Sequence, residues 1–133
     1  MPMLPITSLY AAILALLLLK LAFGVIKIRQ FHKSGLGYEH KDLLLAGRTH
    51  ANATEYVPIS LILLAIAELN GVPGIMLHIP GIVLVVARIG HARGFKLGSG
   101  GAHPGRYWGT LLTWMVIAWL SFINIYYSGP YLF

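Results

Sequence analysis

The stretch Leu4–Ile26 reads LPITSLYAAILALLLLKLAFGVI, an apolar run in which Lys20 is the one charged side chain. As an α-helix it would be about 34 Å long, enough to cross a hydrocarbon core of roughly 30 Å. A secretory signal peptide would carry a basic segment before a shorter apolar core, whereas Met1–Ser8 has no basic side chain. We therefore expect a membrane helix that stays in the protein.

The composition extends this expectation to the whole chain. Of the 133 residues 57% are hydrophobic and 11% are charged, and the mean hydropathy is +0.74. A chain of this size cannot bury so much apolar surface in a water-soluble fold. Three further apolar runs lie at residues 52–67, 72–89 and 110–127. We expect an all-α membrane protein, one domain over residues 1–133, with four transmembrane helices at approximately 4–27, 40–69, 72–91 and 107–127.

The basic residues predict how the helices cross the membrane. Apart from Lys20, they gather between the first and second runs and between the third and fourth, at Lys27, Arg29, Lys33, Lys41, Arg48, Arg88, Arg93, Lys96 and Arg106. By the positive-inside rule, we expect both basic loops in the cytoplasm and both termini on the other side of the membrane. The compact loops and the lack of an organelle signal favour a bacterial inner membrane, with the termini in the periplasm. This placement accounts for the net charge of +6, and no nucleic-acid partner is expected.

The segment Arg48–Pro58 reads RTHANATEYVP and brings polar side chains into the second span. Counting back about 20 residues from Glu68 places Arg48 near the cytoplasmic boundary and Glu55 about 10 Å inside the hydrocarbon. Spacings of four and then three residues put Arg48, Asn52 and Glu55 on one stripe of the helix. Because an unpartnered charge at that depth costs several kcal/mol, the stripe must face protein, water or a ligand.

Two interpretations of this polar stripe stay open from the residues alone. Asn52 and Glu55 can join helices through polar contacts between them. Alternatively, they can bind a ligand, which is the usual role of ionisable residues inside a span. Pro58 removes the backbone hydrogen bond to the Thr54 carbonyl and predicts a bend just past the stripe.

The segment also resembles the signature of a known membrane protein family. RTHANATEYVP is similar to the motif of the MAPEG superfamily, the membrane-associated proteins in eicosanoid and glutathione metabolism. Arg48, Asn52, Glu55 and Pro58 match that motif, and Tyr56 matches a tyrosine that several members place after the glutamate. The resemblance covers the chain length, the four apolar runs and the basic loops. It implies a homotrimer that binds glutathione near the cytoplasmic boundary, similar to a bacterial microsomal glutathione transferase.

The resemblance implies a glutathione transferase or peroxidase that acts in detoxification on lipophilic electrophiles or lipid hydroperoxides. Glutathione carries two carboxylates and one ammonium group. Arg48 is expected to bind a carboxylate through its planar fork, Asn52 a peptide or carboxylate group, and Glu55 the ammonium. Further candidate ligands are Tyr56, His50, Arg29 and His91. For the two histidines, an ordinary position at the membrane interface is the open alternative.

The reactive group of glutathione is its thiolate, and the family supplies an arginine from the start of the last helix to stabilise it. Arg106 in HPGRYWGT occupies the matching region, with Arg93 as a substitute. A nearby cation lowers the pKa of a thiol from about 8.5 and so favours the nucleophilic form. The alternative for Arg106 is a basic residue that only fixes the topology.

Other functions are weighed against this one. The leukotriene-forming synthase of the family has two tyrosines near the end of its third helix. This chain has HARGF there, at residues 91–95, which argues against a leukotriene substrate. A non-enzymatic, lipid-binding scaffold of the same fold stays open. A small drug/proton antiporter carries its membrane acid in the first helix, where this chain has only Lys20. No metal site is expected, because the six histidines are scattered along the chain and form no HExxH motif.

Overall fold

The computed structural model describes residues 3–132. Over these residues the chain forms no strand; it forms α1 (Pro5–His32), α2 (Lys41–Leu69), α3 (Gly74–Leu97), α4 (Pro104–Ser128) and a short 3-10 helix, η1 (Gly129–Tyr131). All four α-helices are long and apolar enough to cross a membrane. The expected all-α fold with four membrane-spanning helices is confirmed.

The helix limits differ from those expected at three of the four helices. α1 continues to His32 instead of ending near residue 27, α3 continues to Leu97 instead of 91, and α4 begins at Pro104 instead of 107. Hydropathy marks where a helix leaves the hydrocarbon, whereas lysine and arginine are good helix formers that continue it into water. Pro104 also suits the first turn of a helix, where no backbone donor is needed.

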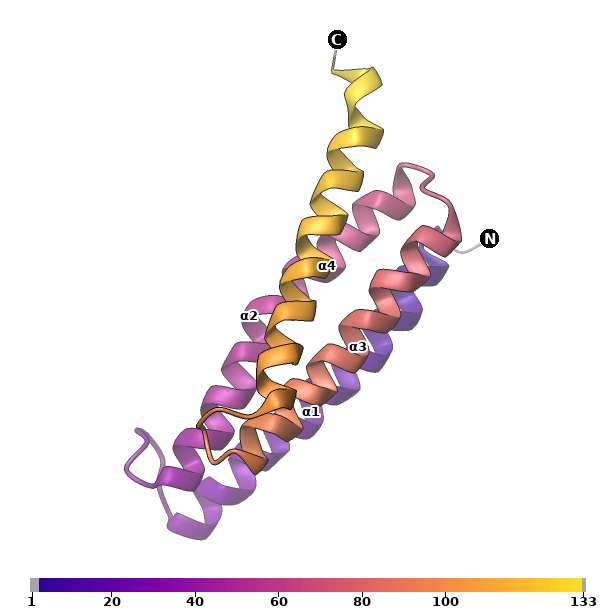
Figure 1. Ribbon diagram of the computed structural model, residues 1–133. Coiled ribbons are helices and arrows are strands. Elements are labelled where there is room, and N and C mark those ends of the chain that lie inside the picture. Colours follow the sequence, from indigo (N-terminus) through magenta and orange to yellow (C-terminus); the bar gives the residue numbers. More distant parts are fainter. Residues whose placement is uncertain (1–2, 133) are drawn as a thin grey trace.

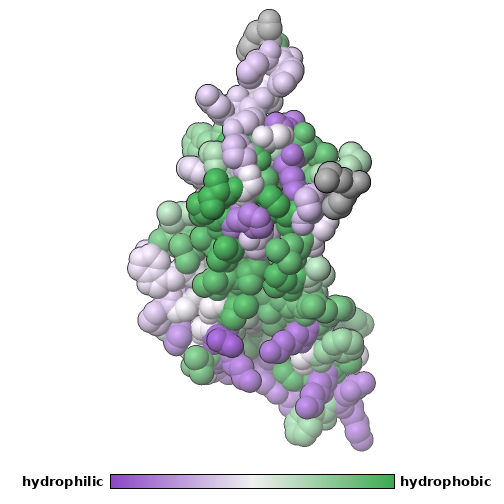
Figure 2. All heavy atoms as spheres, turned by 90° about the vertical axis from the view of Figure 1, so that its right-hand side faces the viewer, coloured by the Kyte–Doolittle hydropathy of each residue, from purple (hydrophilic) through white to green (hydrophobic). Residues whose placement is uncertain are grey.

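The helices run up and down, so the described ends of the chain lie at one end of the bundle (Figure 1). The α1–α2 and α3–α4 loops lie at the other end, called here the basic end. α3 packs most extensively on α4, and α1 packs on α2. Figure 2 shows hydrophobic side chains over the middle of the face in view and hydrophilic ones gathered at the basic end. The core consists mainly of leucine and valine, including Leu14, Val57, Leu64, Leu84 and Leu120.

Tyr10 and His78 form a polar contact inside the bundle near its other end. The Tyr10 hydroxyl lies 2.8 Å from His78 Nδ1 and 3.2 Å from the His78 carbonyl oxygen. The tyrosine ring is buried against Gly81, where any larger residue would collide with it. This pair ties α1 to α3 and satisfies a hydroxyl that burial would otherwise leave without a partner.

Glu68, at the end of α2, provides the N-terminal cap of α1. Its carboxylate oxygens accept hydrogen bonds from the backbone N–H groups of Ile6 at 2.8 Å and Thr7 at 2.7 Å. The first backbone donors of a helix have no partner within it, and a negative charge is favourable beside them. The sequence predicted Glu68 only as a marker of the membrane boundary. The structure shows that it also joins α2 to α1.

We expect Glu68→Ala to lower the free energy of unfolding by about 1–2 kcal/mol, because two backbone donors of α1 lose their acceptor. Thermal unfolding of the detergent-purified protein, followed by circular dichroism, measures this loss. Glu39→Ala is the matched control, since Glu39 is an exposed acidic residue in the α1–α2 loop. An equal loss in both variants would contradict the capping role.

Candidate functional site

The predicted polar stripe of α2 divides between the surface and the interior of the bundle. Arg48 and Glu55 are exposed on the described chain, and Asn52 is half-buried. Asn52 Oδ1 accepts a hydrogen bond from Arg88 Nη2 at 2.7 Å. At 100° per residue Arg48 and Glu55 lie almost in line, while Asn52 is rotated some 40–60° away from them. One edge of the stripe therefore packs inward, and two charged side chains stay available on the outside.

Arg88 is a buried cation, and this corrects its assignment to a basic loop in the sequence analysis. It lies inside α3 with only 2% of its surface exposed. Arg88 Nη2 also lies 3.3 Å from His91 Nδ1, and Arg88 Nη1 lies 3.5 Å from Thr113 Oγ1. Among residues 3–132 it has no carboxylate partner, and its Nε has no hydrogen-bond acceptor. Neutral groups from α2, α3 and α4 thus hold this guanidinium.

A row of side chains on α3 leads from Arg88 towards the basic end. The rings of His91 and Phe95 are 5.7 Å apart, and the guanidinium carbon of Arg106 lies 4.6 Å from the centre of the Phe95 ring. Positions 88, 91 and 95 follow the helical repeat, so they share one face of α3. An arginine at this distance is attracted to the negative face of the ring. The structure therefore connects the Asn52–Arg88 pair with the arginine predicted to activate a thiol.

Small residues allow α4 to approach α3 closely enough for this contact. A side-chain carbon on Gly109 would lie 2.6 Å from the Ala87 carbonyl oxygen, and one on Gly94 would collide with the backbone of Gly105 and Arg106. The two helix backbones are therefore in direct contact beside the polar row. This contact fixes the first turn of α4 against α3 and sets the position of Arg106.

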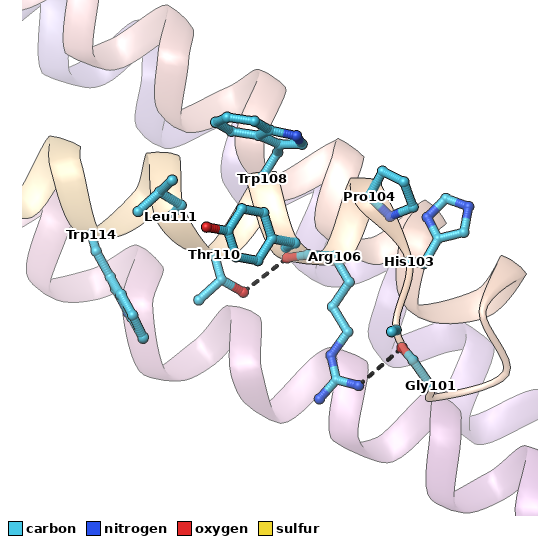
Figure 3. A pocket seen from close by; sticks show the side chains of 10 residues that line it. Gly101, His103, Pro104, Arg106, Trp108, Thr110, Leu111 and Trp114 are labelled. Carbon is cyan, nitrogen blue, oxygen red and sulfur yellow. Dashed lines mark hydrogen bonds between the residues drawn. The ribbon is translucent and has the colours of Figure 1, made fainter.

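Arg106 is half-buried at the start of α4 and holds the α3–α4 loop. Its guanidinium donates hydrogen bonds to the carbonyl oxygens of Gly100 and of Gly101, the latter at 3.3 Å. An open pocket of about 760 Å³ is lined by Arg106 together with Tyr107, Trp108, Thr110 and Trp114. Figure 3 shows Arg106 and Trp114 on one side of α4 and Trp108 on the other. The pocket combines a cation with broad apolar surfaces.

The other candidate ligands are spread around the basic end. Arg29 is half-buried in α1; it donates to the carbonyls of Gly35 and Gly37 at 3.3 and 3.4 Å and lies over the Tyr38 ring. His50 and Tyr56 are half-buried on α2, His91 is buried in the polar row, and Arg93 is exposed. The contacts bring Asn52 and His91 together at Arg88. They do not join Arg48, Glu55, Arg29 or Arg93 to that group.

Arg88 is the residue that sequence reasoning missed. The signal was present, because Arg88 lies within the expected third span at 72–91 and an ionisable residue inside a span has a functional or structural partner. The same rule identifies Glu55 as a site residue. Arg88 is overlooked because it is grouped with the arginines that set the membrane topology.

We expect a double-mutant cycle on Asn52 and Arg88 to give a coupling energy of about 1–3 kcal/mol. Each single change to alanine leaves a buried polar partner unsatisfied, and the second change then costs less. Unfolding in detergent and denaturant measures the four free energies. A parallel cycle of Asn52 with the exposed Arg93 is the control and should give a coupling near zero. Additive effects at Asn52 and Arg88 would refute the contact.

Comparisons with known proteins agree with this architecture. The family model described as "MAPEG family" matches residues 7–126. Two relatives, each named "Inner membrane protein YecN", come from Escherichia coli K12 and Escherichia coli O6:H1. Each is 35% identical to the chain over 126 residues, which cover 92% of both sequences. The chain thus belongs to the MAPEG family.

Proposed function

We propose that this protein binds glutathione at the outer face of α2 and activates its thiol as a membrane-bound glutathione transferase or peroxidase. The observation that carries the proposal is that Arg48 and Glu55 are both exposed on the polar stripe of α2. Glutathione offers the opposite charges, a carboxylate for Arg48 and an ammonium for Glu55. The family includes glutathione transferases, and the chain carries the four motif positions that the resemblance rests on.

The exposed charges of Arg48 and Glu55 also support an assembly of several subunits. In a single chain the Arg48–Glu55 face of α2 would meet lipid, where a charged group costs several kcal/mol. A neighbouring subunit that covers this face would exclude lipid and leave room for a polar ligand, in line with the homotrimer that the family resemblance implies. The names of the relatives place those proteins in an inner membrane. We propose the same location here, with the basic end in the cytoplasm.

The proposed chemistry needs only a stabilised thiolate and a lipophilic acceptor. Arg106 would hold the thiolate, whose sulfur attacks an electrophilic carbon, forms a thioether and expels a leaving group such as chloride. With a lipid hydroperoxide, two glutathione molecules are oxidised to the disulfide while the hydroperoxide is reduced to an alcohol and water. The tryptophan-lined pocket beside Arg106 provides apolar surface for either substrate.

We expect Arg48→Ala and Glu55→Gln each to weaken glutathione binding by about 10- to 100-fold, because each removes one charge-assisted hydrogen bond. Calorimetry on the detergent-purified protein measures the dissociation constant. Lys41→Ala, an exposed basic residue at the start of the same helix, is the control.

Turnover is followed with glutathione and either a chloronitrobenzene or a lipid hydroperoxide. Binding without turnover would favour the non-enzymatic scaffold. Absence of binding in the wild-type protein would overturn the proposal.

We expect Arg106→Ala to raise the pKa of the bound thiol towards the free value of about 8.5. The thiolate absorbance of glutathione-loaded protein, titrated with pH, measures this change. Arg106→Lys separates charge from loop support, because it keeps a cation but loses the guanidinium Nη1 that donates to both loop carbonyls. Arg93→Ala tests the substitute arginine. An unchanged pKa in Arg106→Ala with a raised one in Arg93→Ala would move the role to Arg93.

A further inference from the structure

A second cavity, of about 350 Å³, lies between α1, α2 and α3. It shares no lining residue with the pocket at Arg106 or with the polar row on α3. Its walls include the apolar side chains of Ile28 and Leu45, and its charged residues are Lys20, Asp42 and Lys96. Its size lies at the lower end of small-molecule sites.

Lys20 is the unusual member of this cavity. It lies seven residues before Lys27, which is about 10 Å further into the membrane along α1, and its neighbours in sequence are leucines. Among residues 3–132, no hydrogen bond or ion pair involves its ammonium group. An unpartnered cation at that depth is costly unless an anion or water accompanies it. The cavity is the space beside Lys20 in which such an anion can lie.

The charges around the cavity favour an anionic occupant. Lys96 lies in the last turn of α3 at the basic end. The Asp42 carboxylate lies 2.9 Å from His32 Nε2, so it already has a partner on α1. Two lysines from different helices therefore remain as the charges to be balanced. The rest of the lining is mainly aliphatic, which suits a hydrocarbon chain.

We propose that this cavity binds an anionic membrane phospholipid. Its phosphate balances the positive charges of Lys20 and Lys96, and one acyl chain lies along the aliphatic wall beside Lys20, which includes Leu21. A phosphate is attracted by ammonium groups as point charges, and an acyl chain packs against aliphatic side chains through dispersion contacts. The inference does not depend on glutathione chemistry, since it uses a different face of α2.

Gly24 makes the proposal testable without removing a charge. It lines the cavity, and a side-chain carbon placed on it would meet nothing within 4 Å. Gly24→Leu should therefore occupy the cavity while leaving the helix packing intact. Glycine is also a poorer helix former than leucine, so this variant should fold at least as well as the natural chain.

The experiment is native mass spectrometry of the full chain, purified in detergent, stripped of lipid and then supplied with phosphatidylglycerol. We expect one retained phosphatidylglycerol per chain and at least tenfold weaker retention of phosphatidylcholine with the same acyl chains. Gly24→Leu and Lys20→Gln should each weaken retention at least tenfold. Lys20→Arg, which keeps the charge, and Lys27→Gln, a basic residue of α1 outside the cavity, should retain the lipid as the natural chain does.

Several outcomes would overturn the proposal. Equal retention of the two phospholipids would remove the role of charge, and full retention by Gly24→Leu would place the lipid elsewhere. Retention of oleate but not of phosphatidylglycerol would assign the cavity to a fatty acid carboxylate instead of a phospholipid. If Lys20→Gln does not fold, Gly24→Leu alone decides, with unchanged thermal unfolding as evidence of its intact fold.

Discussion

The buried guanidinium of Arg88 is the constraint on which the basic half of the bundle depends. A charge removed from water must be met by hydrogen-bonding groups, and removing one of them leaves an unsatisfied donor in a medium of low dielectric constant. The groups that meet it are Asn52, His91 and Thr113, which come from three different helices. The register of α2, α3 and α4 is therefore coupled to one side chain. The glycine contacts of α3 with α4 make that register possible.

The polar groups at the two ends of the bundle differ in whether they have partners within the chain, and this difference supports the proposed ligand site on α2. Away from the basic end, Glu68 caps α1 and Tyr10 contacts His78, so these groups have partners within the chain. On α2 near the basic end, Arg48 and Glu55 are exposed. A polar group inside a membrane span that has a hydrogen-bond partner within the chain stabilises the fold. An exposed one needs a partner from outside the chain, such as a ligand, water or another subunit. A ligand site is consequently expected on α2.

Much of the fold follows from the sequence, because the length of an apolar run and the charges beside it depend only on local composition. The same information fails at the helix ends, where α1 and α3 continue as helix past Lys27 and His91. The four-three spacing of Arg48, Asn52 and Glu55 gives angles around α2, but it does not say which neighbouring helix each side chain meets. The partner of Asn52 is 36 residues away on α3. That pairing depends on how the helices pack, which no local pattern contains.

Adjacent residues of α2 face different surroundings. Arg48 and Thr49 differ by 100° around the axis; the first is exposed on the polar stripe, and the second is buried and lines the cavity that contains Lys20. An anion bound by Arg48 and one held by Lys20 would therefore lie on different faces of α2. Arg48 is exposed and can bind a water-soluble peptide from the basic end. The cavity beside Lys20 is lined mainly by aliphatic side chains. One helix can thus keep a polar ligand and a membrane lipid apart, because the helical repeat turns neighbouring side chains towards different surroundings.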